Sequence, residues 1–151
     1  MNRWLSSLAL GGFTAGVLDI SYAVIFSRLR SGVAPIRVLH SVASGLLGRE
    51  AYSGGVGTAA LGLFLHFVIA FGAAGVYLAA SRSLRVLVER PVLSGVVYGV
   101  FVYAFMNLVV LPLSRLPPRT SFPAVVLITG LLVHMFLIGV PIALASRRAH
   151  D

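Results

Sequence analysis

The sequence predicts an all-α fold: a polytopic membrane four-helix bundle with little mass outside the bilayer. Of the 151 residues, 58% are hydrophobic and only 11% are charged, whereas a soluble domain usually carries about 25% charged residues. The mean hydropathy is +0.98. Long apolar runs are typical of helices that meet lipid, because a helix satisfies its backbone hydrogen bonds internally. The sequence therefore predicts that residues 1–151 form a single membrane domain. Membrane lipid is its expected partner.

Four apolar segments have the length of a transmembrane helix, at about residues 4–26, 57–80, 91–113 and 124–146. Each is close to the ~20 residues that cross about 30 Å of hydrocarbon. Pro141 lies inside the fourth segment and predicts a kink there. The third connection contains Pro117 and Pro118, which predict a stiff, extended turn.

The basic residues favour a lipid surface over a nucleic acid. The net charge is +8, and all twelve basic residues are arginine. They stand at the ends of the apolar segments, where anionic headgroups and the insertion machinery select arginine. No basic stretch is interleaved with exposed aromatic residues, so we expect no nucleic-acid partner. The arginines divide evenly between the two sides, which leaves the orientation open, and the bacterial inner membrane is the expected location.

The first connection contains a predicted interfacial helix, at about residues 34–48, between the first two spans. It begins near Pro35, and apolar residues from Ile36 to Leu47 recur at helical spacing, with polar residues elsewhere around the helix. This amphipathic pattern is typical of a helix that lies on the bilayer surface.

The chain carries an internal similarity that predicts a tandem repeat of a two-helix hairpin. Residues 62–66 (GLFLH) resemble residues 130–134 (GLLVH), so His66 aligns with His134. The preceding spans agree more weakly through two small-xxx-small pairs, Gly12 with Gly16 and Gly95 with Gly99. Such pairs let two helix backbones approach closely. Chance similarity between apolar segments is the alternative.

Few strongly polar side chains fall inside the spans. They are Asp19, His66, Asn107 and His134, with Tyr22 and Tyr103 nearby in sequence. Ionisable groups are costly in hydrocarbon, so they are functional candidates that should face the bundle interior. The structural alternatives are contact with water or pairing with Arg28 or Arg30 at the interface for Asp19, hydrogen bonding between helices for the histidines and asparagine, and an interfacial aromatic belt for the tyrosines.

Three kinds of site use these residues. In the first, His66 and His134 ligate the iron of haem b from opposite sides, and Gly62 and Gly130 leave room for the macrocycle. In the second, His66, His134 and Asp19 bind a divalent metal. In the third, a lipophilic ligand such as a quinone exchanges protons in a pocket formed by Asp19, Tyr22, Asn107 and Tyr103.

The functional hypothesis is a membrane protein with a buried cofactor or small-ligand site between the second and fourth spans, with haem-based electron transfer as one form. One alternative is an accessory or assembly subunit of a larger membrane complex. A further alternative is a small proton-linked transporter that acts as a homodimer. The chain has no cysteine, which excludes disulfides and iron–sulfur clusters. No nucleotide-binding or hydrolase motif is present, so no catalytic residue is assigned.

Overall fold

The computed structural model describes residues 2–116 and 123–150, and every regular element within them is helical. This confirms the predicted all-α class. Four helices are long and apolar enough to cross a membrane: Arg3–Ser31, Gly55–Ala80, Pro91–Leu113 and Ala124–Arg147. The turn predicted at Pro117 and Pro118 lies outside the described residues.

The first two of these are the uninterrupted helices α1 (Arg3–Ser31) and α3 (Gly55–Ala80). The third apolar helix comprises α5 (Pro91–Phe105), a π-helical segment (Met106–Val110) and α6 (Leu111–Leu113). The fourth comprises α7 (Ala124–Val133), a π-helical segment (His134–Gly139) and α8 (Val140–Arg147).

Helix α1 continues five residues beyond the predicted end at Phe26. Arg28 and Arg30 occupy its last turn, where cations interact favourably with the negative end of the helix dipole. The helix stops at Gly32, which has φ +66° and donates its N–H to the Arg28 carbonyl. The longer helix leaves Asp19 about 18 Å from its end at a rise of 1.5 Å per residue, deeper than the apolar run alone predicts.

The two π-helical segments share a cause. Each ends two residues before a proline, Pro112 in one case and Pro141 in the other. Proline has no N–H and its ring crowds the carbonyl four residues earlier, so a wider turn relieves the clash. A π-helical segment therefore precedes Pro141, where the sequence predicts a kink.

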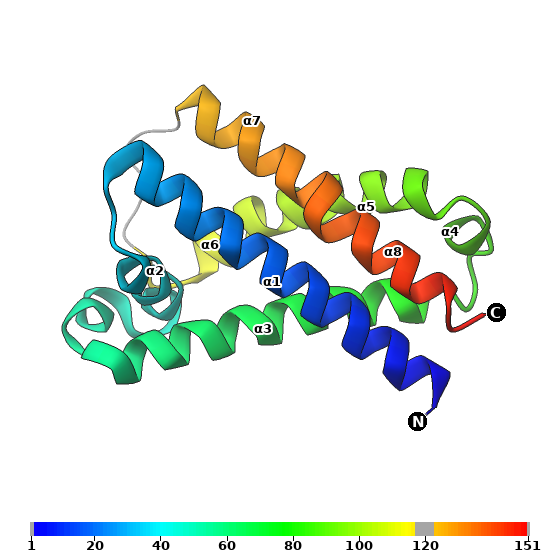
Figure 1. Ribbon diagram of the computed structural model, residues 1–151, viewed down its shortest axis with the longest axis horizontal. Helices are drawn as coiled ribbons and strands as arrows, with labels where there is room; N and C mark the ends of the chain where they lie inside the picture. The colour runs from blue at the N-terminus through cyan, green and yellow to red at the C-terminus, as the bar shows by residue number, and fades with distance from the viewer. Residues whose placement is uncertain (1, 117–122, 151) are drawn as a thin grey trace.

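The four long helices run side by side along the long axis of the molecule (Figure 1). Helix α1 packs against α3 and against α8, and α8 packs in turn against α5. Both termini and the short helix α4 (Val86–Glu89) lie at one end, and α2 (Pro35–Leu47) lies at the other (Figure 1). We refer to these as the terminal end and the α2 end.

Helix α2 confirms a helix in the first connection and is followed by a 3-10 turn at Gly48–Ser53. It is seen nearly end-on where α3 lies across the view, so it runs transverse to the long helices (Figure 1). Its buried face consists of His40, Ala43 and Ser44, while Ile36 and Leu46 are 39% and 53% exposed. The apolar side of α2 is therefore partly left outside the protein interior.

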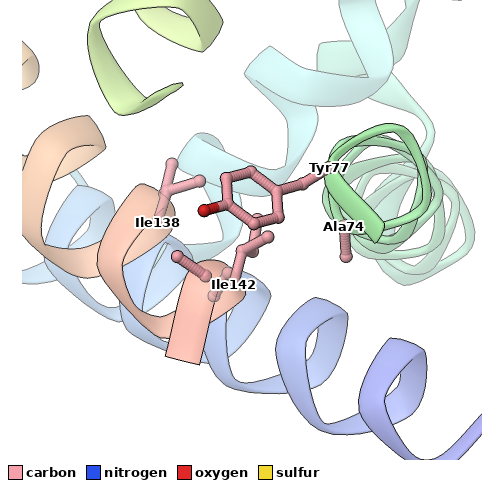
Figure 2. Packing of buried hydrophobic residues seen from close by; sticks show 6 residues of the cluster. Ala74, Tyr77, Ile138 and Ile142 are labelled. Carbon is pink, nitrogen blue, oxygen red and sulfur yellow. The ribbon is translucent and has the colours of Figure 1, made fainter. Parts of the chain in front are cut away.

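Small residues at the centre of the molecule allow close helix packing. The buried cluster contains Ala15 of α1, Ala74 and Tyr77 of α3, and Ile138, Ile142 and Ala143 of the fourth apolar helix. Tyr77 points from α3 toward Ile138 and Ile142 (Figure 2) and is 1% exposed. Its hydroxyl donates to the Leu87 carbonyl at 2.9 Å, which fixes α3 to the α4 connection.

The two hairpins cross at equivalent positions. A side chain at Gly16 would meet Phe67, and one at Gly99 would meet Met135; these neighbours directly follow the aligned residues His66 and His134. Likewise, Gly12 faces Phe71, and Gly95 faces Gly139, each five residues after the aligned histidine. The first hairpin packs a glycine against an aromatic ring, whereas the second packs backbone against backbone.

Tyr98 links the third apolar helix to α3, because its hydroxyl donates to the Ala73 carbonyl at 2.7 Å. We expect Tyr98→Phe to lower the free energy of unfolding by about 1 kcal/mol or less, since hydrogen bonds between membrane helices contribute about that much. Thermal unfolding in detergent followed by circular dichroism measures the effect. Tyr52→Phe is the control, because the Tyr52 hydroxyl makes no hydrogen bond to the described residues. An equal loss in both variants would contradict the prediction.

Candidate functional site: an acid–imidazole pair between α1 and α3

Asp19 of α1 and His66 of α3 face each other inside the molecule. The His66 Nδ1 atom lies 3.9 Å from the Asp19 Oδ2 atom, and the two side chains are 12% and 25% exposed. His66 is about 17 Å from the start of α3 and Asp19 about 18 Å from the end of α1, at 1.5 Å per residue. Both residues therefore sit near the middle of helices of membrane-spanning length.

The His66 ring is oriented by the backbone of α1. Its Nε2 atom lies 2.8 Å from the Gly16 carbonyl oxygen. A carbonyl only accepts hydrogen bonds, so Nε2 carries the proton and Nδ1 is the atom left facing Asp19. Gly16 has no side chain, which allows α3 to approach and Phe67 to pack on the glycine. The glycine thus positions the imidazole.

The separation within the acid–imidazole pair exceeds hydrogen-bonding distance. Direct hydrogen bonds between nitrogen and oxygen fall at about 2.7–3.2 Å, whereas Nδ1 and Oδ2 are 3.9 Å apart. Within the described residues, no hydrogen bond reaches the Asp19 carboxylate. A third polar group that bridges the two atoms would satisfy both of them.

Tyr22 provides a further polar atom on the same helix. It lies three residues after Asp19, and residues at that spacing share a helix face. Its ring stacks on Phe26 with a centroid separation of 5.2 Å. The Tyr22 hydroxyl is buried and has no hydrogen-bond partner among the described residues, which is unfavourable in the absence of a ligand or water.

His134 makes different contacts from its aligned partner. Its Nδ1 atom donates to the Gly130 carbonyl of its own helix at 2.9 Å. Its ring lies edge-on to Tyr103, with the centroids 5.2 Å apart. The Tyr103 hydroxyl donates to the Leu127 carbonyl at 3.1 Å, and the Asn107 amide donates to the Tyr103 carbonyl at 2.9 Å. His134 and Asn107 thus bond to carbonyls four residues earlier in their own helices, and only the Tyr103 hydroxyl joins two helices.

The predicted site residues thus belong to two sets of contacts. Asp19 and His66 come together between α1 and α3, and Tyr22 shares the α1 segment with Asp19. His134, Tyr103 and Asn107 gather where the third and fourth apolar helices meet. The pair therefore lies between the first and second apolar helices, whereas the sequence placed the site between the second and fourth.

The metal hypothesis required Asp19, His66 and His134 to converge. No group of three or more His, Cys, Asp or Glu side chains within residues 2–116 and 123–150 is placed to hold a metal ion. The three-residue metal site is accordingly not formed in this structure. The three residues do not converge because the His134 ring bonds to a carbonyl of its own helix and packs against Tyr103.

The space predicted for a haem macrocycle is filled in the structure. A side chain at Gly62 would meet the backbone of α2 at Leu39 and Ala43, and one at Gly130 would meet the Tyr103 ring at 3.1 Å. These glycines allow close packing of α2 on α3 and of Tyr103 on α7. Haem ligation by His66 and His134 stays a prediction, which a Soret band in the purified protein would test.

His40 is a buried residue that the sequence analysis did not single out. It is 4% exposed, and its Nε2 atom donates to the Gly55 carbonyl at 2.8 Å. Gly55 has φ +61°, a left-handed conformation that favours glycine. The bond thus fixes α2 to the start of α3. The only signal in the sequence was a histidine on the polar side of an amphipathic segment, which is too common to indicate a role.

The fold and the site define an all-helical protein with four apolar helices of membrane-spanning length and an acid–imidazole pair between two of them. Comparison of the chain with known protein families, with curated proteins and with solved structures finds no match. The function therefore has to be argued from the residues themselves.

Proposed function

We propose that the chain is an integral membrane protein, a four-helix bundle built from a duplicated hairpin, with α2 at the bilayer surface. Its long helices leave bulky apolar side chains exposed, among them Phe64 (64%), Phe101 (57%) and Leu108 (75%). Exposed apolar surface of this kind is expected to face lipid. The equivalent glycine crossings support the duplication. In a bacterium the inner membrane is the expected location, since spanning proteins of the outer membrane are β-barrels.

We further propose that the protein binds a small lipophilic ligand with hydrogen-bonding groups, of the quinone or phenol class, and exchanges a proton with it. The observation that carries this proposal is the acid–imidazole pair, with Nδ1 and Oδ2 3.9 Å apart at mid-helix depth. A charged side chain at such a depth costs several kcal/mol, and that cost marks a functional residue.

The geometry of the pair argues against a purely structural bond. A bond that only joins two helices would be direct, as it is between the Tyr98 hydroxyl and the Ala73 carbonyl at 2.7 Å. Here the carboxylate and the imidazole remain apart, and Asp19 is a quarter exposed. A ligand that arrives from within the membrane can therefore reach the carboxylate.

A bridging ligand has a defined role for each atom. A phenolic hydroxyl of the ligand donates to the Asp19 carboxylate, or a carbonyl of the ligand accepts from protonated Nδ1 of His66. In a phenol or quinol, the hydroxyl proton passes to the Asp19 carboxylate and leaves a phenolate oxygen, whereas a quinone carbonyl only accepts a hydrogen bond; Nε2 remains bonded to the Gly16 carbonyl in both cases. The Tyr22 hydroxyl is a candidate donor to a second polar group of the ligand.

The test is binding of a radiolabelled short-chain quinone to the protein purified in an uncharged detergent, with the corresponding quinol as competitor. We expect Asp19→Asn to weaken competition by the quinol, whose hydroxyl donates to the carboxylate, and His66→Gln to weaken binding of the quinone, whose carbonyl accepts from Nδ1. Each effect should be about tenfold, because a hydrogen bond to a charged group contributes about 1.5 kcal/mol or more. His134→Gln is the matched control, since it alters the aligned histidine outside the pair, and it should leave binding unchanged.

Two outcomes would contradict the proposed function. If His134→Gln weakened binding as much as His66→Gln, the acid–imidazole pair would not be the site. If the folded wild-type protein bound neither quinone nor quinol, this ligand class would be excluded. In that case, copurification with other membrane proteins would favour the accessory-subunit hypothesis.

A further inference from the structure

A cavity of about 330 Å³ opens at the terminal end of the molecule, and its lining includes neither member of the acid–imidazole pair. It lies where the first turns of α1 meet the end of the fourth apolar helix, and α1 packs against α8. Residues from both ends of the chain line it: Arg3, Ser6, Ser7, Leu10 and Arg148.

The lining of this terminal cavity suits a phosphate group. It contains two guanidinium groups and two serine hydroxyls, and within residues 2–116 and 123–150 no carboxylate lines it. Within the described residues, neither Arg3 nor Arg148 forms an ion pair with a protein carboxylate. Arginine is well matched to phosphate, because its planar group offers several donors in a fixed geometry.

A second hollow at the same end provides a contrast. It measures about 240 Å³ and is lined by Ser81, Arg82, Arg85, Val88, Glu89 and His150. Glu89 brings a negative charge into this hollow, and the Arg82 guanidinium lies over the Trp4 ring, 4.4 Å from its centroid. The terminal cavity is therefore the better anion site of the two.

The surroundings of the terminal cavity point to a lipid as the source of the phosphate. Leu10 lies about two turns after Arg3 along α1. It is 40% exposed and gives the cavity an apolar wall. Trp4 follows Arg3 directly and packs edge-on against His150, with the ring centroids 4.9 Å apart. Tryptophan gathers at the level of lipid headgroups, so the cavity lies where a lipid phosphate is expected.

We propose that the terminal cavity binds the phosphate of an anionic phospholipid headgroup, with Arg3 and Arg148 as its cationic ligands and Leu10 against the upper acyl chain. The proposal rests on the membrane location and is independent of the ligand at Asp19 and His66. Inorganic phosphate shares the recognised group but has no acyl chain, so it serves as the competing source in the experiment.

The experiment compares retention of phosphatidylglycerol and phosphatidylcholine by the full-length protein, using native mass spectrometry from uncharged detergent micelles. We expect phosphatidylglycerol to be retained preferentially. Arg3→Gln and Arg148→Gln should each weaken its binding by about fivefold, since an arginine near a lipid surface contributes about 1 kcal/mol. Arg147→Gln is the matched control: it removes the same charge from the adjacent residue, which does not line the cavity.

Three results would overturn this proposal. Equal retention of the two lipids by the wild-type protein would show that the anionic headgroup is not recognised. Equal weakening by Arg147→Gln and Arg148→Gln would show that net charge, and not the cavity, attracts the lipid. Displacement of the lipid by inorganic phosphate at the same concentration would show that the acyl chain contributes nothing. Circular dichroism of each variant establishes that it is folded.

Discussion

Gly99→Ala is expected to lower the free energy of unfolding by about 2–3 kcal/mol, within the range typical of overpacked interiors. A methyl group at Gly99 would meet the backbone of His134 and Met135, closer than real side chains approach. Backbone atoms cannot rotate away as a flexible side chain can, so the third and fourth apolar helices would have to separate. Thermal unfolding in detergent, followed by circular dichroism, measures the change.

Gly72→Ala is the matched control for this substitution. Gly72 lies in α3, is exposed, and has no neighbouring atom within 4 Å of an added methyl group among the described residues. Alanine is the better helix former, so this variant should be unchanged or more stable by up to about 1 kcal/mol. If Gly99→Ala behaved like Gly72→Ala, the close crossing at Gly99 would be incorrect.

Removal of His66 alone is expected to destabilise the protein more than removal of both members of the pair. In His66→Leu, the Asp19 carboxyl group loses the imidazole that faces it, and we expect a loss of about 1–3 kcal/mol, less than for fully buried pairs because Asp19 is a quarter exposed. The double variant Asp19→Leu with His66→Leu places two apolar groups in an apolar setting. Its stability should be close to that of the wild type, because apolar replacement of an ion pair is often neutral or stabilising.

The double-mutant cycle separates a structural from a functional pair. The four proteins are unfolded under identical conditions, and the coupling free energy is the difference between the double variant and the sum of the single ones. A functional pair predicts a stable double variant that has lost binding of the quinone probe. A double variant less stable than either single variant would instead mean that the pair holds the fold together.

The helical elements were largely predictable because long apolar runs of membrane-spanning length favour helices, which satisfy their backbone hydrogen bonds internally. Apolar runs such as 57–80 match α3 almost residue for residue. The end of α1 was wrong by five residues, since the dipole effect of Arg28 and Arg30 is not visible in hydropathy. The π-helical segments were not predicted either, although Pro141 marked the position of one of them.

The candidate site was only partly predictable. Asp19 and His66 were both named from the cost of polar groups in lipid, and the structure brings them together. The sequence treated His134 as the equivalent of His66, yet the two residues differ in their bonds. The difference arises at the helix crossings: in the first hairpin an aromatic ring packs on Gly16, whereas in the second the His134 backbone packs on Gly99. No alignment of the two motifs reveals that choice.

The terminal cavity could not be predicted from the sequence at all. Arg3 and Arg148 are 145 positions apart in the sequence, and nothing in either segment indicates that they share a cavity. The sequence indicated only that each arginine lies at the end of an apolar segment. Their meeting depends on the packing of α1 against α8, which sets the first and last turns of the bundle beside each other.

The sequence by itself determined that the chain is helical and how many apolar helices it has. It also determined which polar side chains lie within those helices, where burying them is costly. These properties follow from composition and spacing, because helix length and the cost of burying charge are local quantities. Only the tertiary structure decided which polar residues meet. Partner choice is set by the rotation and depth of each helix, and those depend on contacts of a few small residues, such as Gly16 and Gly99, with neighbours far away in the chain.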